Sequence, residues 1–254
     1  MITIKTKKEI DILREGGKRL AGILLKVRKA VRPGVTSLSL DLLAEKLIRE
    51  AGDEPAFLRY QPWGAQYPYP ASLCVSVNNE VVHGIPGTTK LKDGDIVSLD
   101  LGIRHEGLIT DAAVTVAVGH ADANAEKLIR ITQEALGIGI LEVKPGNFVG
   151  DIGKAIEKFV KPYGYGVVKL LGGHGVGYEV HEEPFIPNYK IKGNGPKLKT
   201  GMVLAIEPML NEGTDDVYLD KDGYTFKTAD GKRSAHFEHT VVVTDKGAEI
   251  LTTL

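Results

Sequence analysis

Apolar residues recur at helical spacing in two stretches of the chain, and each stretch ends at a basic residue followed by Pro-Gly. These stop signals lie at residues 32–34 and 144–146. Another segment with the same helical period follows each of them. The predicted helices span residues 8–31, 40–52, 124–143 and 150–160.

Strand-like segments with a shared layout follow the helices in each half of the chain. Two predicted strands, 94–100 and 201–207, begin with glycine and end in a carboxylate, and each precedes a return strand with another carboxylate, at 110–118 and 237–245. The repeat predicts an α+β fold with two helix-helix-hairpin halves, roughly 8–118 and 123–245, related by a pseudo-twofold axis around a central antiparallel sheet. Coincidental similarity between unrelated segments is the alternative.

Composition and charge narrow the class of protein. The 254 residues carry a formal net charge of -1, which gives no overall reason to expect nucleic acid or a membrane surface as the main partner. Cys74 is the single cysteine, which excludes an internal disulfide framework and fits a reducing compartment. The first ten residues lack an apolar leader, and no run reaches membrane-spanning length, so a cytoplasmic protein is expected. Lys5, Lys7 and Lys8 are predicted to form the solvated start of the first helix.

The first predicted hairpin brings two aspartates together. A two-residue turn at 105–106 would pair residues whose numbers sum to 211, which places Asp100 directly opposite Asp111. Like charges in that arrangement are destabilising, and neither strand carries Lys or Arg among its apolar residues. A three-residue loop that includes Gly107 would stagger the pair but leave both within reach of one ion. Two acids on a solvated face are the alternative.

The second half adds two carboxylates in apolar surroundings. Glu207 ends the run MVLAI, and Glu238 precedes the run TVVV after one histidine. Four buried carboxylates cannot all stay ionised without counter-charge, because burial and mutual repulsion each raise their pKa values. Two divalent cations would balance them. With one imidazole added, the ligand set is typical of sites for Mn, Fe, Co or Zn.

The stretch LGGHGVGYEVHEEP, residues 171–184, contains His174 and His181 among four glycines. Glycine at this density argues against a helix, and an odd spacing on a straight strand would point the two rings to opposite faces. The chain is therefore expected to bend between them, and the glycines at 172, 173, 175 and 177 make a bend inexpensive. The stretch alone does not say what the site holds.

Six short motifs together resemble one family. They are NNEVVHGIP (78–86), VSLDLG (97–102), ITDAA (109–113), GGHGVGYEVHEEP (172–184), AIEPM (205–209) and FEHTVVVT (237–244). In this order and at these intervals, they make the chain similar to the type I methionine aminopeptidases, which have the pita-bread metallopeptidase fold. The resemblance covers essentially the whole chain. It implies a single catalytic metallopeptidase domain over residues 1–254, which hydrolyses the bond after an N-terminal methionine when the second residue is small.

The resemblance also implies residue roles. The metal ligands are Asp100, Asp111, His174, Glu207 and Glu238, with Asp111 and Glu238 bridging two divalent ions whose identity the ligands leave open. His83 and His181 then contact the substrate, and Glu207 carries the proton of the attacking water. Tyr69, Cys74 and Tyr224 surround the methionine side chain.

Some residues depart from the family pattern or fall outside it. Val180 stands where many relatives carry an aromatic residue, Tyr224 where many carry tryptophan, and Leu171 also differs, which puts the pocket's shape in doubt. The other histidines, His105, His120, His236 and His239, are expected to be structural or exposed. Of these, His239 adjoins the proposed ligand Glu238.

Several other functions fit parts of the pattern. The same fold serves X-Pro aminopeptidases and prolidases, and it also occurs in non-catalytic binding proteins. A mononuclear iron oxygenase would need two histidines and one carboxylate. The resemblance implies nascent polypeptide N-termini as substrates and a transient encounter with the ribosome, although no patch in the sequence marks ribosome binding. A monomer is expected.

Overall fold

The helices form where the apolar period predicts them. The computed structural model describes residues 1–253, in which the helices are α1 (Lys7–Ala30), α2 (Ser37–Glu50), α3 (Ala123–Leu141), α4 (Val149–Val160) and a 3-10 turn, η1 (Lys161–Tyr163). Thr6 begins α1 with a capping box, because its hydroxyl accepts the Glu9 N–H while the Glu9 carboxylate accepts the Thr6 N–H at 2.7 Å. None of the helices in the described residues combines the length and apolarity needed to cross a bilayer.

The segment before α1 corrects one prediction. Lys7 and Lys8 are exposed, as predicted, but the side chain of Lys5 is completely buried. Its ammonium lies 2.6 Å from a carboxylate oxygen of Glu182. A buried charge needs such a partner. Because the partner lies 177 residues further along the chain, the local pattern of charges around Lys5 could not reveal it.

One large antiparallel sheet joins the two halves. Within residues 1–253 its strands are β1 (Glu54–Pro55), β2 (Leu73–Val77), β4 (Ile96–His105), β5 (Leu108–Ala117), β7 (Gly173–Gly175), β8 (Glu182–Ile186), β9 (Val203–Ile206), β14 (Glu238–Thr244) and β15 (Gly247–Ile250). The order is β1-β4-β5-β14-β9-β7-β8, with β2 beside β4 and β15 beside β14. The pair β4–β5 of the first half therefore meets the pair β14–β9 of the second half at the contact of β5 with β14.

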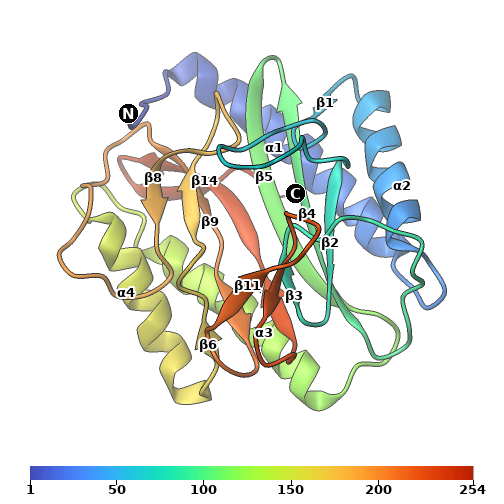
Figure 1. Ribbon diagram of the computed structural model, residues 1–254. Helices are drawn as coiled ribbons and strands as arrows, with labels where there is room; N and C mark the ends of the chain where they lie inside the picture. The colour runs from blue at the N-terminus through green and yellow to red at the C-terminus, as the bar shows by residue number, and fades with distance from the viewer. Residues whose placement is uncertain (254) are drawn as a thin grey trace.

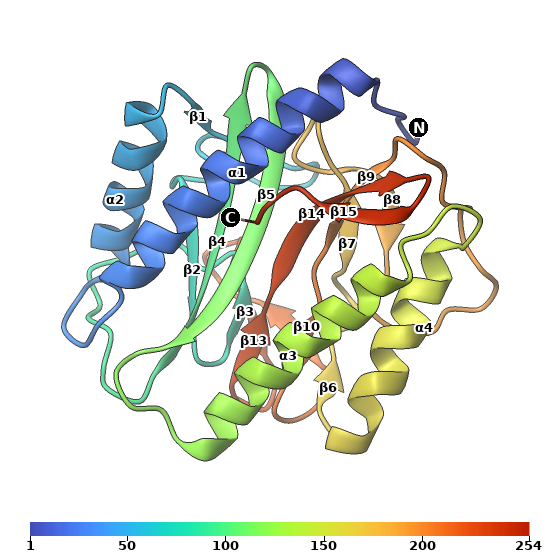
Figure 2. The same cartoon turned by 180° about the vertical axis from the view of Figure 1, so that it is seen from behind.

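Helices cover one face of this sheet. Figures 1 and 2 show α1 and α3 lying across that face, with α2 and α4 beside them toward opposite edges. Each half has its own apolar cluster, which includes Leu20 and Leu99 in the first half and Leu128 and Ile206 in the second. Full burial of each such side chain stabilises the fold by about 2 kcal/mol. The predicted α+β arrangement of two halves around a central antiparallel sheet is confirmed.

The turn between β4 and β5 differs from the predicted one. His105 pairs with Leu108, so the turn consists of Glu106 and Gly107, whose φ angles are 45° and 85°. Positive φ at both positions is the conformation of a type I′ hairpin turn, which favours glycine at its second position. Partner numbers therefore sum to 213 rather than 211.

The shift in register changes how the two aspartates meet. Asp100 lies opposite Ala113, and Asp111 lies opposite Gly102. The predicted direct pairing of the two aspartates is therefore wrong. They are offset along the hairpin, and both remain on the same face of the sheet because side chains alternate with a period of two.

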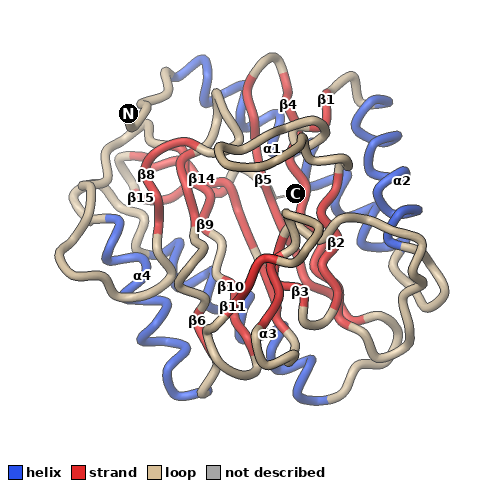
Figure 3. The backbone as a smooth tube through the Cα atoms, viewed as in Figure 1, coloured by secondary structure: helices blue, strands red, loops and turns tan. Residues whose placement is uncertain are grey.

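The segment of the chain between β9 and β14 forms two small sheets with strands from earlier in the sequence (Figure 3). One contains β6 (Gly166–Val167), β10 (Met209–Asn211) and β13 (Ser234–His236), and the other contains β3 (Glu80–Val82), β11 (Val217–Leu219) and β12 (Phe226–Thr228). The repeat in the sequence did not predict them, since only the second half carries so long a connection between its two main strands.

Candidate metal centre and substrate pocket

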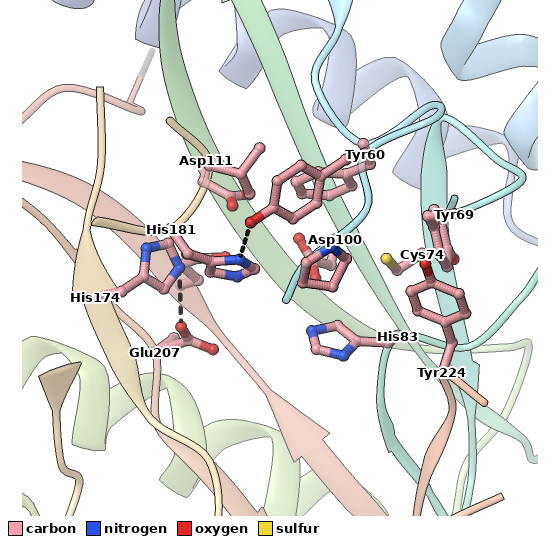
Figure 4. A pocket seen from close by; sticks show the side chains of 14 residues that line it. Tyr60, Tyr69, Cys74, His83, Asp100, Asp111, His174, His181, Glu207 and Tyr224 are labelled. Carbon is pink, nitrogen blue, oxygen red and sulfur yellow. Dashed lines mark hydrogen bonds and ion pairs between the residues drawn. The ribbon is translucent and has the colours of Figure 1, made fainter. Parts of the chain in front are cut away.

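One pocket collects every residue that the sequence predicts for the site (Figure 4). Its lining includes Asp100, Asp111, His174, Glu207, Glu238, His83, His181, Tyr69, Cys74 and Tyr224. The central strands β4, β5, β7 and β14 supply four of these side chains, and Glu207 directly follows β9. Strands from both halves of the sheet therefore bring carboxylates to the same pocket.

The carboxylates are buried and incompletely paired. Ligand atoms of Asp111, His174 and Glu238 all lie within 4.8 Å of one another. Among the described residues, Asp100 Oδ1, Asp111 Oδ1 and Glu238 Oε1 have no hydrogen-bond partner. Burial raises the pKa of Asp111 to about 7. Burial, followed by the charge of neighbouring carboxylates, raises the pKa values of Asp100, Glu207 and Glu238 well above their usual range.

His174 presents a lone pair to this cluster. Its Nδ1 lies 2.9 Å from the carbonyl oxygen of Gly175, which can only accept, so Nδ1 carries the proton of the neutral ring. Burial, followed by the nearby ring of His181, lowers the pKa of His174 to about 3, so the ring is neutral. Its Nε2 lies 3.3 Å from Glu207 Oε1. Two acceptors at this separation require a proton or a cation between them.

The chemistry of the donors fits divalent metal ions. Four carboxylates with one imidazole form an oxygen-rich set that suits first-row divalent ions, and sulfur is absent from the predicted ligands. The unpartnered oxygens and the unprotonated imidazole nitrogen all belong to that set. Cations bound among them would offset the burial that raises the four carboxyl pKa values and the repulsion that adds to it at Asp100, Glu207 and Glu238.

The glycines around His174 act differently from the prediction. An added Cβ at Gly173 would lie 2.3 Å from the carbonyl oxygen of Ala205, and one at Gly175 would lie 2.3 Å from that of Glu183. These glycines therefore let β7 approach its two neighbouring strands rather than bend the chain. Of the four glycines, only Gly177 has a positive φ, 140°. The connection from β7 to β8 nevertheless returns the chain, and the rings of His174 and His181 have centroids 4.5 Å apart.

His83 and His181 face the same pocket as neutral rings. Burial lowers the pKa of each to about 4, and for His83 the neighbouring His181 contributes as well. Nδ1 of His181 lies 2.9 Å from the hydroxyl of Tyr60. His83 has φ 58°, a left-handed conformation that is uncommon outside glycine and gathers at functional sites.

The remaining wall of the pocket is uncharged. The rings of Tyr69 and Tyr224 pack edge to face with centroids 5.1 Å apart, and Val180 is buried beside them. Burial raises the pKa values of Cys74 and Tyr69 well above their usual range, so both stay neutral. The Tyr69 hydroxyl donates to the carbonyl of Gly84 at 2.9 Å. Such a wall suits an apolar side chain.

The structure adds lining residues that the sequence did not single out. Phe57, Tyr60 and Pro62 come from the connection between β1 and β2, where no apolar period marks them. The cluster of aromatic residues and prolines in YQPWGAQYPYP, residues 60–70, was the available signal. Trp63, beside Pro62, is fully exposed. Leu171, whose identity raised doubt about the pocket, packs against a separate apolar cluster and does not line it.

The other histidines are buried in the structure or exposed, as predicted, but one of them lies beside the carboxylates. His105 is buried against an aspartate, and His120 is exposed. His239 is hydrogen-bonded to a threonine near the end of the chain. His236, predicted to be structural or exposed, is buried with its Nε2 3.4 Å from Glu207 Oε2. It therefore borders the carboxylate cluster, although it does not line the pocket.

The chain belongs to metallopeptidase family M24, whose sequence model matches residues 11–245. A methionine aminopeptidase from Clostridium perfringens is 48% identical to it over 252 residues, with 99% of each chain covered. The crystal structure of a methionine aminopeptidase from Rickettsia prowazekii superposes with a TM-score of 0.95 at 40% identity, covering 99% of this chain and 100% of the other. The resemblance seen in the sequence motifs is confirmed.

A more distant relative has the same fold at much lower sequence identity. A prolidase from Pyrococcus horikoshii superposes with a TM-score of 0.76 at 23% identity, and the match covers 98% of this chain but only 63% of the prolidase. At that identity the likeness shows the shared fold alone. The full-length similarity therefore favours the methionine aminopeptidases over the X-Pro peptidases.

Proposed function

We propose that the protein hydrolyses the first peptide bond of chains that begin with methionine followed by a small residue. The observation that carries the proposal is the buried set of carboxylates and one neutral imidazole, with unpartnered oxygens, beside an uncharged wall. Similarity to methionine aminopeptidases over the full length supports the same activity. Neither the X-Pro activity nor a purely binding role has a comparable observation in its favour.

Five residues would hold two divalent ions of the Mn, Fe, Co or Zn type: Asp100, Asp111, His174, Glu207 and Glu238. Asp111 and Glu238 would contribute to both sites. When bound, the ions supply Lewis acidity and lower the pKa of a water molecule enough for it to attack at neutral pH.

Glu207 moves the proton of the attacking water in this proposal. Its side chain is among the buried carboxylates, and burial raises its pKa well above the usual range. As a carboxylate beside the attacking water, Glu207 can take a proton from that water and then pass it to the leaving amine.

His181 stabilises negative charge on the scissile carbonyl oxygen. In this proposal the Tyr60 hydroxyl, 2.9 Å from His181 Nδ1, donates to that nitrogen, which puts the proton of the neutral ring on Nε2, where it can donate into the pocket. His83, also neutral, contacts the leaving nitrogen. Tyr60 thus sets the tautomer that the reaction requires.

The apolar wall receives the methionine side chain. Tyr69, Cys74 and Tyr224 surround it, and Val180 completes the surface near His181. The flexible, polarizable thioether of methionine fits an uncharged, partly aromatic surface. A charged first residue would lose its hydration without gaining a partner.

The proposal extends to the whole chain and its setting. Residues 1–254 act as one catalytic domain with the internal repeat 8–118 and 123–245, because strands from both segments supply ligands to one pocket. Nascent chains in the cytoplasm still carry the initiator methionine, so they are the natural substrates, met in brief contact with the ribosome. The enzyme acts as a monomer.

The test is turnover of a Met-Ala-Ser peptide by metal-free protein reloaded with Mn, Fe, Co or Zn in turn. Release of free methionine with at least one ion, and none without metal, is expected. Hydrolysis of X-Pro dipeptides without release of methionine would show that the protein is an X-Pro peptidase instead. Binding of the peptide without hydrolysis, whichever ion is added, would indicate a binding protein without catalytic activity.

A further inference from the structure

The N-terminal strap, residues 2–9, lies against the connection that carries His181. That connection, residues 176–181 between β7 and β8, is called here the His181 loop. Lys5 of the strap lies 2.6 Å from Glu182 Oε2, and the side chains of this pair are 0% and 7% exposed. The Thr3 hydroxyl donates to the same carboxylate oxygen at 2.5 Å. Glu182 directly follows His181, so the strap is anchored one residue away from that ring.

The second oxygen of Glu182 binds the His181 loop itself. Glu182 Oε1 accepts the backbone N–H groups of Tyr178 at 2.6 Å and of Glu179 at 3.2 Å. A second link joins the same elements, because the Tyr178 hydroxyl donates to Glu9 at 2.7 Å. The carboxylate of Glu182 therefore connects the strap, through Lys5, to the turn that leads into His181.

Two glycines make room for the strap. A Cβ at Gly177 would lie 2.5 Å from Lys5 Cε, and a Cβ at Gly201 would lie 2.7 Å from Ile4 Cγ2. The Lys5 N–H also donates to the carbonyl of Gly201 at 2.8 Å. The left-handed φ of Gly177 adds a second reason for glycine there. The backbone on both sides is thus shaped to receive Lys5.

Stability alone does not explain a pair of this kind. Removing two charges from water costs free energy, and replacing a buried ion pair by apolar residues of similar volume is often neutral or stabilising. A buried ion pair that fixes the backbone is useful where a small displacement of a neighbouring catalytic side chain would lower the reaction rate. His181 and Val180 lie on the pocket side of this loop, with the Tyr60 hydroxyl on Nδ1 of the His181 ring.

We infer that Lys5 and Glu182 are positioning residues for His181. Tyr60 fixes the ring from the pocket side, while the Lys5–Glu182 pair fixes the backbone behind it. The inference rests on the proposed function, in which His181 donates to the scissile carbonyl. Loss of the pair should misplace the donor without touching the metal ligands. A 1 Å misplacement of a catalytic group can cost roughly a hundredfold in rate.

The decisive experiment is a double-mutant cycle between the strap and His181. Lys5→Met should lower kcat for Met-Ala-Ser roughly tenfold or more, with KM and bound metal per chain little changed. In a His181→Ala background the same substitution should lower kcat no further, because the group that it positions is gone. An equal loss in both backgrounds would show that Lys5 acts by another route. The matched controls are Lys7→Met and Lys8→Met, which change exposed lysines of the same segment.

Two further measurements keep the inference testable under other outcomes. Thr3→Val removes the hydrogen bond that Thr3 donates to Glu182 and the one that it accepts from Lys5, but it leaves the Lys5–Glu182 ion pair. It should therefore give a smaller loss in the same direction even if Lys5→Met fails to fold. Imidazole NMR signals report position without catalysis. In either strap variant those of His181 should shift while those of exposed His120 stay in place. Unchanged His181 signals would overturn the inference. Absence of methionine release by the wild type would instead overturn the proposed function.

Discussion

Each half of the sheet gives two carboxylates to the pocket, but the two halves support them differently. In the first half, Asp100 and Asp111 lie within ten-residue strands joined by a two-residue turn. In the second, Glu207 follows the four-residue strand β9, and residues 208–237 separate it from Glu238. The shorter aspartate side chains thus lie on a continuously paired hairpin, whereas the longer glutamate side chains flank a long and less regular connection.

This difference separates two tasks within one pocket. The first hairpin is almost entirely paired, so its contribution to the metal centre depends on register alone. The long connection of the second half does more, because it carries Tyr224 of the pocket wall and strand β12, whose Phe226 ring packs beside His83. We expect changes in the sheet to affect metal binding, and changes in the connections to affect substrate.

The largest effect is expected from removing either of the two carboxylates that are proposed to contribute to both metal sites. Asp111→Asn and Glu238→Gln should each abolish measurable turnover and release metal, because a neutral amide no longer balances the bound charge. Metal content per chain, measured after dialysis, and kcat for Met-Ala-Ser check this result. His120→Ala, on the exposed surface, is the control. Near-normal activity and metal content in only one of the two variants would show that the two halves do not contribute equally to metal binding.

A second prediction divides the two histidines of the β7–β8 region. His181→Ala should lower kcat roughly a hundredfold with bound metal unchanged, the scale of losing one donor to a developing oxyanion. His174→Ala should instead weaken metal binding, because Nε2 of this residue offers the lone pair. Parallel metal titrations and steady-state kinetics separate the two effects. Equal loss of metal in both variants would show that their roles are misassigned.

The third prediction concerns pH in the metal-free protein. Burial raises the pKa of Asp111 from its ordinary value of 3.8 to about 7, so the folded state binds this proton more tightly than the unfolded chain does. Its contribution to stability is therefore full below about pH 4 and is lost as pH rises to about 7. Thermal unfolding should show a lower Tm at pH 8 than at pH 5. Added Mn²⁺ should reverse the decrease at pH 8, and Asp111→Asn should reduce it.

The smallest effects are expected in the pocket wall. Leucine in place of methionine at the first position should lower kcat/KM by about tenfold, the scale of a methylene-sized misfit. Val180→Phe should sharpen that preference by narrowing the wall, without altering the choice between Ala and Phe at the second position. Peptides varied separately at each position provide the measurement. Cleavage of Met-Phe as fast as Met-Ala would contradict the proposed rejection of large second residues.

Periodicity predicted the helices and the four main strands because amphipathic segments bury one face whatever their partners are. The apolar strands also pointed to four carboxylates that line one pocket in the structure, whereas His174 was added as a ligand by the family resemblance. The register of the first hairpin depended on the backbone angles of Glu106 and Gly107, which hydrophobic patterning does not specify. A glycine-rich stretch fits a bend and a close approach equally well, so the roles of the glycines were also misjudged.

Other features required contacts across the chain. Lys5 is paired with Glu182, which lies 177 residues further along the chain. The place of Tyr60 beside His181 follows from a connection without a repeating pattern. His236 borders Glu207 because β13 pairs with β10, where His236 lies opposite Met209, two residues after Glu207, and this pairing was not visible from its local sequence. Local propensity carries no information about such neighbours.

Trp63 gives the protein a built-in optical reporter. It is the single tryptophan of the chain, it is fully exposed, and it adjoins Pro62 in the pocket lining. Its emission should therefore be that of an indole in water until a peptide covers the mouth of the pocket. Binding of the peptide substrate can then be timed by intrinsic fluorescence, separately from bond cleavage and without attaching a dye.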